Sequence, residues 1–336
     1  MGDTMSQLTL RALALALVLA PLPLSNALAH CVVGGRFFPA TLVTDDPCVA
    51  DEMSSPTVQW NSANPAGREH DIEGDFSKRI TEDFGVTVSS TWTRVRPPAD
   101  AGTVGPSAYG FQNLVTTPQF QILKDASSEL ALLGGVIFTW GNSGASGVGA
   151  TPWSTITPTF YFGKGFGDLP DSAGWLRAFA VTGQIGYEIP TTSLDLVSGN
   201  PVPQNLVWAS ALQFSMPYFR SSVIDLGLPD FINHLIPIVE SQFSAPVANK
   251  SGINFVITGT VNPGVIWVGN YYQVGVEAIV PVNRASGTSI GALAQLHLYL
   301  DDIFPKGIGR PLLGNAAPPM LPFGNASTPG RPPFGN

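Results

Sequence analysis

The chain of 336 residues has little charge, few histidines and only two cysteines. Charged residues make up 12% of it against 44% hydrophobic residues, and the net charge is −8 at pH 7. Without a basic cluster, the chain lacks the electrostatic footprint that nucleic-acid binding requires. After the N-terminus, no stretch reaches the ~18 uninterrupted apolar residues of a transmembrane helix. We therefore expect no nucleic-acid partner and no helical membrane span in the mature chain.

Sequence motifs for nucleotide chemistry are also scarce. The glycine-rich stretch Gly163–Gly167 resembles a phosphate-binding loop, but such a loop needs a helix directly after it. The following residues, 167–172, form an acidic, proline-containing turn instead. We interpret the glycines as the point where the chain leaves a strand and turns.

Candidate catalytic groups do not cluster. Residues 141–145, GNSGA, lack the second glycine of a nucleophile elbow. The histidines His30, His70, His234 and His297 lie far apart in the sequence. We expect no enzymatic activity and no cofactor; the alternative is a catalytic site grafted on the fold, which no fold excludes.

The N-terminus predicts export. Arg11 precedes the apolar run 12–20, and Ala27 and Ala29 are small residues at the positions that a signal peptidase reads. Residues 1–29 are therefore predicted to be a signal peptide, with His30 first in the mature chain. The alternative is an uncleaved N-terminal membrane anchor.

An exported chain enters an oxidising compartment, so Cys31 and Cys48 are predicted to form a disulfide. A metal site made by both cysteines with His30, Asp45 and Asp46 is the alternative. No standard ligand spacing supports it, and we expect no metal.

From about residue 70, apolar and polar side chains alternate with period two, the pattern of a strand with two different faces. For example, Ile156 and Phe160 share one face of their segment, while Thr157 and Tyr161 share the other. Eleven segments show the pattern, and a twelfth is expected: 71–79, 84–95, 110–123, 127–141, 153–164, 176–189, 205–219, 232–246, 252–266, 271–282 and 290–301.

Segments of this length suit a membrane. Strands of soluble sandwiches usually have about five or six residues, whereas a tilted strand of about 9–11 residues spans the hydrocarbon core. Only helices and closed barrels satisfy every backbone group there. Aromatic residues near the segment ends resemble interfacial girdles: Trp92, Trp140, Trp153, Trp208, Tyr218, Trp267, Tyr271 and Tyr272. The pattern predicts an all-β fold, an antiparallel transmembrane β-barrel of about 12 strands over residues 70–304; a soluble β-sandwich or β-helix is the alternative.

The polar face of these segments would line the lumen. The candidates are Gln119, Gln121, Thr157, Tyr161, Gln184, Glu188, Gln213, Glu240, Gln242, Glu277, His297 and Asp301. Their charged members are mostly acidic, which should disfavour anions and admit cations or neutral solutes. Alternatively, these groups pair with Lys or Arg across the lumen and brace the barrel.

The chain ends lie outside this barrel. Residues 30–69 are expected to form an N-terminal periplasmic segment that contains the disulfide. Residues 305–336 are rich in Pro and Gly, and we predict a flexible tail. Contact of this tail with the cell wall or a partner is the alternative.

Several stretches resemble a known family: 36–41 (RFFPAT) with 45–47 and 50–52, 76–81 (FSKRIT), 162–170 (FGKGFGDLP), 237–240 (PIVE) and 300–304 (LDDIF). They are similar to proteobacterial outer-membrane β-barrel transporters labelled as phenol-degradation (MetA-pathway) proteins, over residues 30–313. The resemblance implies a barrel in the bacterial outer membrane, in contact with outer-membrane lipid.

For function, the resemblance implies passive passage of small molecules, hydrophobic or aromatic ones among them. A structural or binding barrel with a plugged lumen is the alternative. The sequence identifies neither the solute nor an oligomeric state.

Overall fold

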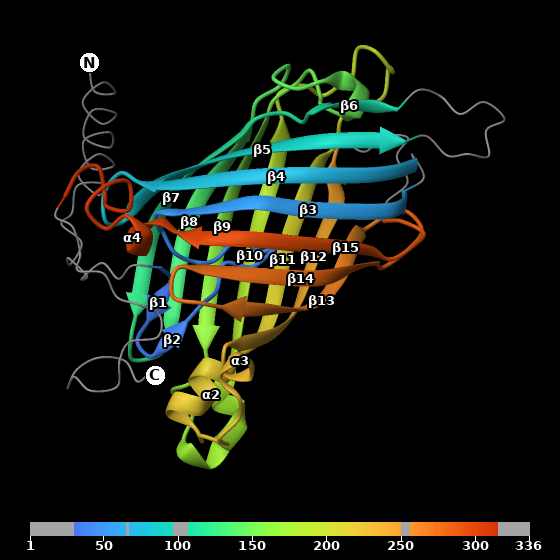
Figure 1. Cartoon of the computed structure of the whole chain (residues 1–336). Helices are drawn as coiled ribbons and strands as arrows, with labels where there is room; N and C mark the ends of the chain where they lie inside the picture. Colours follow the sequence, from blue (N-terminus) through green and yellow to red (C-terminus); the bar gives the residue numbers. More distant parts are fainter. Residues whose placement is uncertain (1–29, 65–66, 97–106, 250–255, 315–336) are drawn as a thin grey trace, which may run out of the picture.

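The computed structural model describes residues 30–64, 67–96, 107–249 and 256–314. The predicted signal peptide, residues 1–29, and residues 315–336 of the tail lie outside these ranges. Twelve long antiparallel strands form one sheet, and pairing of the first, β3, with the last, β15, closes it into a barrel (Figure 1). The strands are β3 (Glu52–Asn64), β4 (Gly67–Arg79), β5 (Phe84–Arg96), β7 (Val115–Asp125), β8 (Leu130–Thr139), β9 (Thr155–Gly165), β10 (Phe179–Pro190), β11 (Gln204–Phe214), β12 (Leu235–Ala248), β13 (Thr258–Val268), β14 (Tyr272–Pro281) and β15 (Gly291–Tyr299).

The all-β prediction with about twelve strands is confirmed, but the barrel begins at Glu52 rather than at residue 70. The strand missed by the sequence analysis is β3. Its register against the neighbouring strand shifts between Ser54 and Thr57, and again between Asn61 and Asn64. A bulge adds a residue and so reverses the alternation of side chains, which hides such a strand from a search for period two.

The barrel exterior is apolar. Large apolar side chains project outward from the middle of the strands, among them Ile72, Val88, Phe120, Ile122, Phe160, Ile185, Leu212, Val239, Val274 and Val276. Aromatic pairs lie towards the strand ends, including Phe179–Phe214 and Trp267–Tyr272. An apolar band between aromatic residues on a closed sheet is the surface of a membrane-spanning barrel.

The two ends of the barrel differ. The short strand β6 (Ala108–Phe111) and the 3-10 helix η1 (Ser146–Val148) lie at one end, which we call the far end. The opposite end carries η2 (Asp171–Ala178), α2 (Met216–Ser222), α3 (Asp230–Asn233) and α4 (Leu300–Ile303) (Figure 1). None of the helices in the described ranges is long and apolar enough to cross a membrane.

Helix α2 corrects one sequence expectation. Ser215 caps it by accepting a hydrogen bond from the Tyr218 backbone N–H at 3.2 Å, and Pro217 lies in its first turn. These are helix-start signals, so strand β11 ends at Phe214 rather than at residue 219. Tyr218 is consequently not part of an interfacial girdle but is buried within the protein.

The N-terminal segment enters the barrel. We call residues 30–51 the plug; it contains the hairpin β1 (Val32–Val33) and β2 (Arg36–Phe37). Apolar plug residues Val32, Phe37 and Leu42 pack in one buried cluster with inward side chains of the barrel wall. The predicted Cys31–Cys48 disulfide is confirmed and lies wholly within the plug. We call the helix-bearing end of the barrel the plug end.

Residues 305–314, assigned to the flexible tail from sequence, are held at the plug end. The backbone N–H groups of Leu312 and Leu313 donate to the carbonyls of Arg79 and Ile80. Lys78 donates to the carbonyls of Ile308 and Arg310. The first part of the tail thus packs against the turn between β4 and β5.

We predict that Ile185→Arg, on the outer face of β10, lowers the free energy of unfolding in lipid vesicles by about 2–4 kcal/mol, the cost of Arg near a bilayer midplane. Gln242→Arg is the matched control, since Gln242 is exposed to the lumen. Denaturant titration of both variants checks this. Equal, small losses for the two would contradict the assignment of the outer face to lipid.

Candidate functional site

The structure places eleven of the twelve lumen candidates on inward faces of strands. These are Gln119, Gln121, Thr157, Tyr161, Gln184, Glu188, Gln213, Glu240, Gln242, Glu277 and His297. The twelfth, Asp301, lies in α4 beyond the last strand, where it is buried. The inward residues have two different surroundings: some hold the plug, and others line a water-accessible chamber beside it.

Glycines in the wall make room for the plug. A Cβ atom at Gly163 would lie 2.5 Å from Cγ of Pro47, and one at Gly165 would lie 2.7 Å from Nε of Arg36. Both glycines are within strand β9 and face inward. Strand β9 ends at Gly165 and Gly167 lies in the turn after it, as predicted. Gly163 and Gly165 have a second role, which the sequence did not indicate: they thin the wall where the plug lies against it.

Glu240 on β12 anchors the middle of the plug. Its carboxylate accepts backbone hydrogen bonds from Leu42 at 2.7 Å, Val43 at 3.1 Å and Thr44 at 2.8 Å. The side chain is fully buried. Hydrogen bonds to a charged group stabilise by about 1.5–3 kcal/mol each, so this one carboxylate fixes the path of three consecutive plug residues.

Arg36 anchors the plug hairpin and is also fully buried. Its Nε donates to Glu129 Oε2 at 3.1 Å, and its other nitrogens donate to the carbonyls of Ala178 and Arg177. Its guanidinium lies 3.7 Å from the centre of the Tyr218 ring, a cation–π contact. The planar guanidinium thus joins the plug to three connections at the plug end.

Glutamines of the wall hold further parts of the plug, Gln121 through the backbone and Gln119 through a side chain. Gln121 accepts from the N–H of Val49 at 3.1 Å and donates to the carbonyl of Pro47 at 3.0 Å. Gln119 donates to the Asp45 carboxylate at 2.9 Å. A long amide side chain offers both a donor and an acceptor, so it can satisfy a backbone that lies in neither a helix nor a sheet.

The first described residue, His30, is fastened beside the last strand. Its backbone N–H donates to Asp301 Oδ2 at 3.0 Å, and its ring pairs with Asp301 at 3.1 Å and with Asp302. Burial lowers the pKa of His30, but the two aspartates outweigh this effect and raise the pKa to about 10. Arg79 approaches the same Asp301 at 4.0 Å. His30 is therefore an imidazolium held between two carboxylates.

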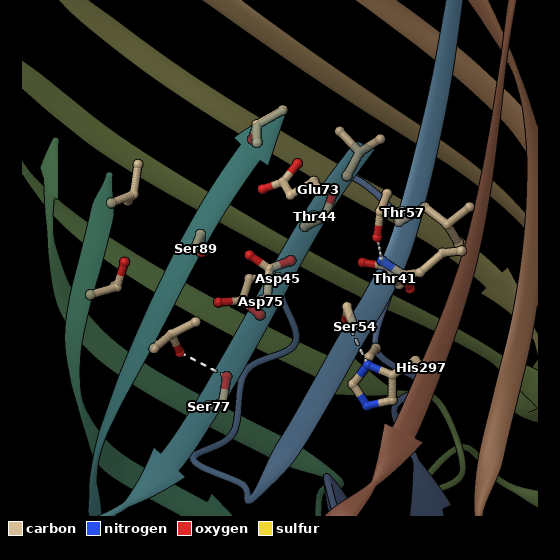
Figure 2. A pocket seen from close by; sticks show the side chains of 18 of the residues that line it. Thr41, Thr44, Asp45, Ser54, Thr57, Glu73, Asp75, Ser77, Ser89 and His297 are labelled. Atoms are coloured by element: carbon tan, nitrogen blue, oxygen red, sulfur yellow. Dashed lines mark hydrogen bonds between the residues drawn. The ribbon is translucent and has the colours of Figure 1, made fainter. Parts of the chain in front are cut away.

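On one side of the plug is a cavity of about 360 Å³, which we call the chamber. Plug residues Ala40–Asp45 form part of its wall, and strands β3, β4, β5 and β15 form much of the rest. Figure 2 shows Asp45 of the plug beside Asp75 of β4, with Glu73 close by. His297 lies at another side, where its Nδ1 is 2.8 Å from Ser54 Oγ.

The chamber is acidic. Five carboxylates line it, from Asp45, Glu52, Asp71, Glu73 and Asp75, and none of its described lining residues is Lys or Arg. Loss of water around Asp45 raises its pKa, the hydrogen bond from Gln119 lowers it, and the negative charge of Asp75 raises it; the resulting pKa is about 6. The alternative that lumen acids are paired with Lys or Arg across the lumen does not hold for this chamber.

None of these five carboxylates is among the lumen candidates of the sequence analysis. Asp71, Glu73 and Asp75 are spaced two residues apart within one strand, and this period alone puts them on one face. That signal was available. Arg36 and Asp45 had no such signal, because their positions depend on the plug folding back into the barrel.

Neither a family model nor a curated protein matches the chain. Among solved structures, a COG4313 outer membrane channel from Pseudomonas putida F1 is 9% identical with a TM-score of 0.49, over 78% of this chain and 99% of that one. The NanC porin is 6% identical with a TM-score of 0.44, over 73% and 97%. The Salmonella typhi outer membrane phospholipase is 10% identical with a TM-score of 0.37, over 79% and 94%.

These likenesses are too distant to identify a function. The chain's own strand pairing, apolar exterior and filled lumen define its class. It is an outer-membrane type of β-barrel whose lumen is plugged by its own N-terminal segment.

We predict that Glu240→Ala speeds hydrogen exchange at the amides of Leu42, Val43 and Thr44 by about 10–100-fold, because each loses a charge-assisted hydrogen bond. Gln242→Ala, two residues along the same strand, is the control and should leave these amides unchanged. Exchange followed by mass spectrometry on the folded barrel checks this. Unchanged rates in Glu240→Ala would show that Glu240 does not hold the plug.

The His30 fastening predicts a dependence on pH. A group whose pKa is raised on folding stabilises the fold fully below its unfolded pKa, about 6.5, and the contribution is lost as pH rises towards 10. The free energy of unfolding of the wild type should exceed that of His30→Asn by a few kcal/mol at pH 6, and the difference should shrink towards pH 10. A difference that stays constant would contradict the imidazolium.

Proposed function

We propose that this chain is a bacterial outer-membrane channel for the passive passage of small polar solutes, with a preference for cations. The observation that carries the proposal is the chamber, in which five carboxylates meet without a Lys or Arg among the described lining residues. Rings and clusters of carboxylates favour cations over anions in pores.

In this proposal the solute enters the chamber from the far end. A second cavity of about 420 Å³ is lined by β10, β11, β12 and β13 and by Ala285 and Ser286 of a far-end loop. Gln184 and Gln242 line both cavities, so the two are neighbours in the lumen. Towards the plug end the lumen is filled by the plug, so passage through the whole barrel requires plug residues to shift.

The chamber favours a polar solute over a hydrophobic or aromatic one. Its lining consists mainly of carboxyl, hydroxyl and amide groups, and Tyr161 is its one aromatic residue among those described. A small organic amine or a hydrated inorganic cation matches these acceptors. An apolar solute would displace water from the carboxylates without compensating their charge, which is costly in an enclosed space.

A second candidate is a barrel that binds its solute in the chamber but does not conduct. The many anchors of the plug, from His30 to Val49, favour it.

We propose no catalytic role: the Ser143 hydroxyl donates to the carbonyl of Trp140 in a loop at the far end, whereas His30 and His297 lie at the plug and the chamber.

Ion conductance of the purified barrel in planar lipid bilayers tests the proposal. The wild type should carry a steady current with a reversal potential on the cation side in a salt gradient. Asp75→Asn combined with Glu73→Gln should shift that potential towards zero, because two chamber charges are removed. The control is Asp168→Asn, outside the lumen at the plug end, which should change nothing.

Two outcomes would decide against the channel. Silence with a folded barrel would favour the binding alternative. A current whose selectivity ignores the chamber variants would mean that the ions follow another route.

The Asp45 carboxyl predicts that selectivity depends on pH. Since its pKa is raised to about 6, Asp45 is mostly neutral at pH 5 and mostly charged at pH 7.5. Cation preference should therefore rise from pH 5 to pH 7.5, and Asp45→Asn should weaken that rise. The measurement is the reversal potential at both pH values; an equal change in the variant would exclude Asp45 as the titrating group.

A further inference from the structure

A second acidic site lies deeper in the lumen, beneath the plug. Glu240 on β12 and Glu277 on β14 are separated by one strand, β13. The Glu277 side chain passes over β13 at Gly264, which has no side chain of its own. A Cβ atom at Gly264 would lie 2.5 Å from Cγ of Glu277. The Glu277 carboxyl therefore lies against Glu240 and against Asn262, which is paired in register with Glu240.

Polar atoms in this site lack partners. Both carboxyl oxygens of Glu277 and both amide atoms of Asn262 are buried without a hydrogen bond of normal geometry among the described residues, and the same holds for the nearby Gln213. Asn262 and Gln213 are each 1% exposed. Within the described ranges, neither glutamate forms an ion pair with Lys, Arg or His.

The charge of this site needs compensation. Glu240 is held as a carboxylate, since it accepts three backbone N–H donors of the plug. A second buried carboxylate beside it would be strongly repelled unless it kept a proton or shared a cation with Glu240. The buried amide oxygens of Asn262 and Gln213 accept no hydrogen bond of normal geometry among the described residues, so they can join the two carboxylates around a cation.

We propose that Glu240, Glu277 and Asn262, with Gln213 at the edge, bind one hard cation, for which Ca²⁺ is the probe. All the side-chain ligands are oxygens, the donors that such cations select. The cation would lie beneath Leu42–Thr44 and strengthen the attachment of the plug. The site is separate from the chamber, and its existence does not depend on whether the barrel conducts.

The test is Ca²⁺ binding to the purified, folded full-length chain after treatment with a chelator, by calorimetry and by hydrogen exchange. In the wild type, Ca²⁺ should slow exchange at Leu42, Val43 and Thr44 by at least about tenfold, which corresponds to about 1.4 kcal/mol. Glu277→Gln should lose this effect and one bound Ca²⁺. Asp168→Asn, outside the lumen, is the control and should keep the slowing.

Asn262→Asp provides a variant that does not remove a ligand. A third carboxylate should tighten Ca²⁺ binding at a cation site, and should destabilise the barrel without Ca²⁺. Gel mobility of unheated against boiled samples verifies that each variant is folded. The proposal is overturned if exchange at Leu42–Thr44 does not respond to Ca²⁺ in the wild type, or if it responds equally in Glu277→Gln. In either case, a proton shared by the two glutamates is the remaining explanation of the site.

Discussion

The arrangement of the lumen depends on one carboxylate that satisfies a stretch of irregular backbone. A segment placed inside a barrel brings N–H and C=O groups that no strand ladder satisfies, and an unpaired buried backbone group is costly. Glu240 accepts three such N–H groups in succession. Gln121 and Gln273 also bind backbone groups of the plug, so polar residues that would suit a water-filled pore here act as a substitute for secondary structure.

Features that depend on local interactions could be predicted from the sequence, whereas features that depend on contacts between distant residues could not. Alternation with period two is local, and it was enough for eleven strands, for the outer face and for the inward direction of the polar residues. Strand β3 was missed because two register shifts break its period. The glycines at the end of β9 were predicted correctly to precede a turn, but the contact of Gly163 with Pro47, more than a hundred residues earlier, could not be predicted.

The chamber shows the same limit. Asp71, Glu73 and Asp75 share a face by spacing alone, and careful reading of one strand could have found them. Asp45 meets them only because the plug folds back into the lumen. No pattern within residues 30–51 distinguishes a segment outside the barrel from a plug within it; the complementary groups are on the wall, at Gln184, Glu240 and Gln273.

The seam where β3 pairs with β15 is also the place where both ends of the plug are attached, and this affects how the molecule is assembled. Asp51, the last plug residue, binds Arg79 and accepts the N–H of Leu300 just after β15, while His30 is fastened to Asp301. Both ends of the plug are therefore attached at the seam where the first and last strands meet. Since β15 is synthesised last, the ring closes after all other strands exist, and the same residues complete the seam and the seating of the plug. The barrel is therefore closed around the plug.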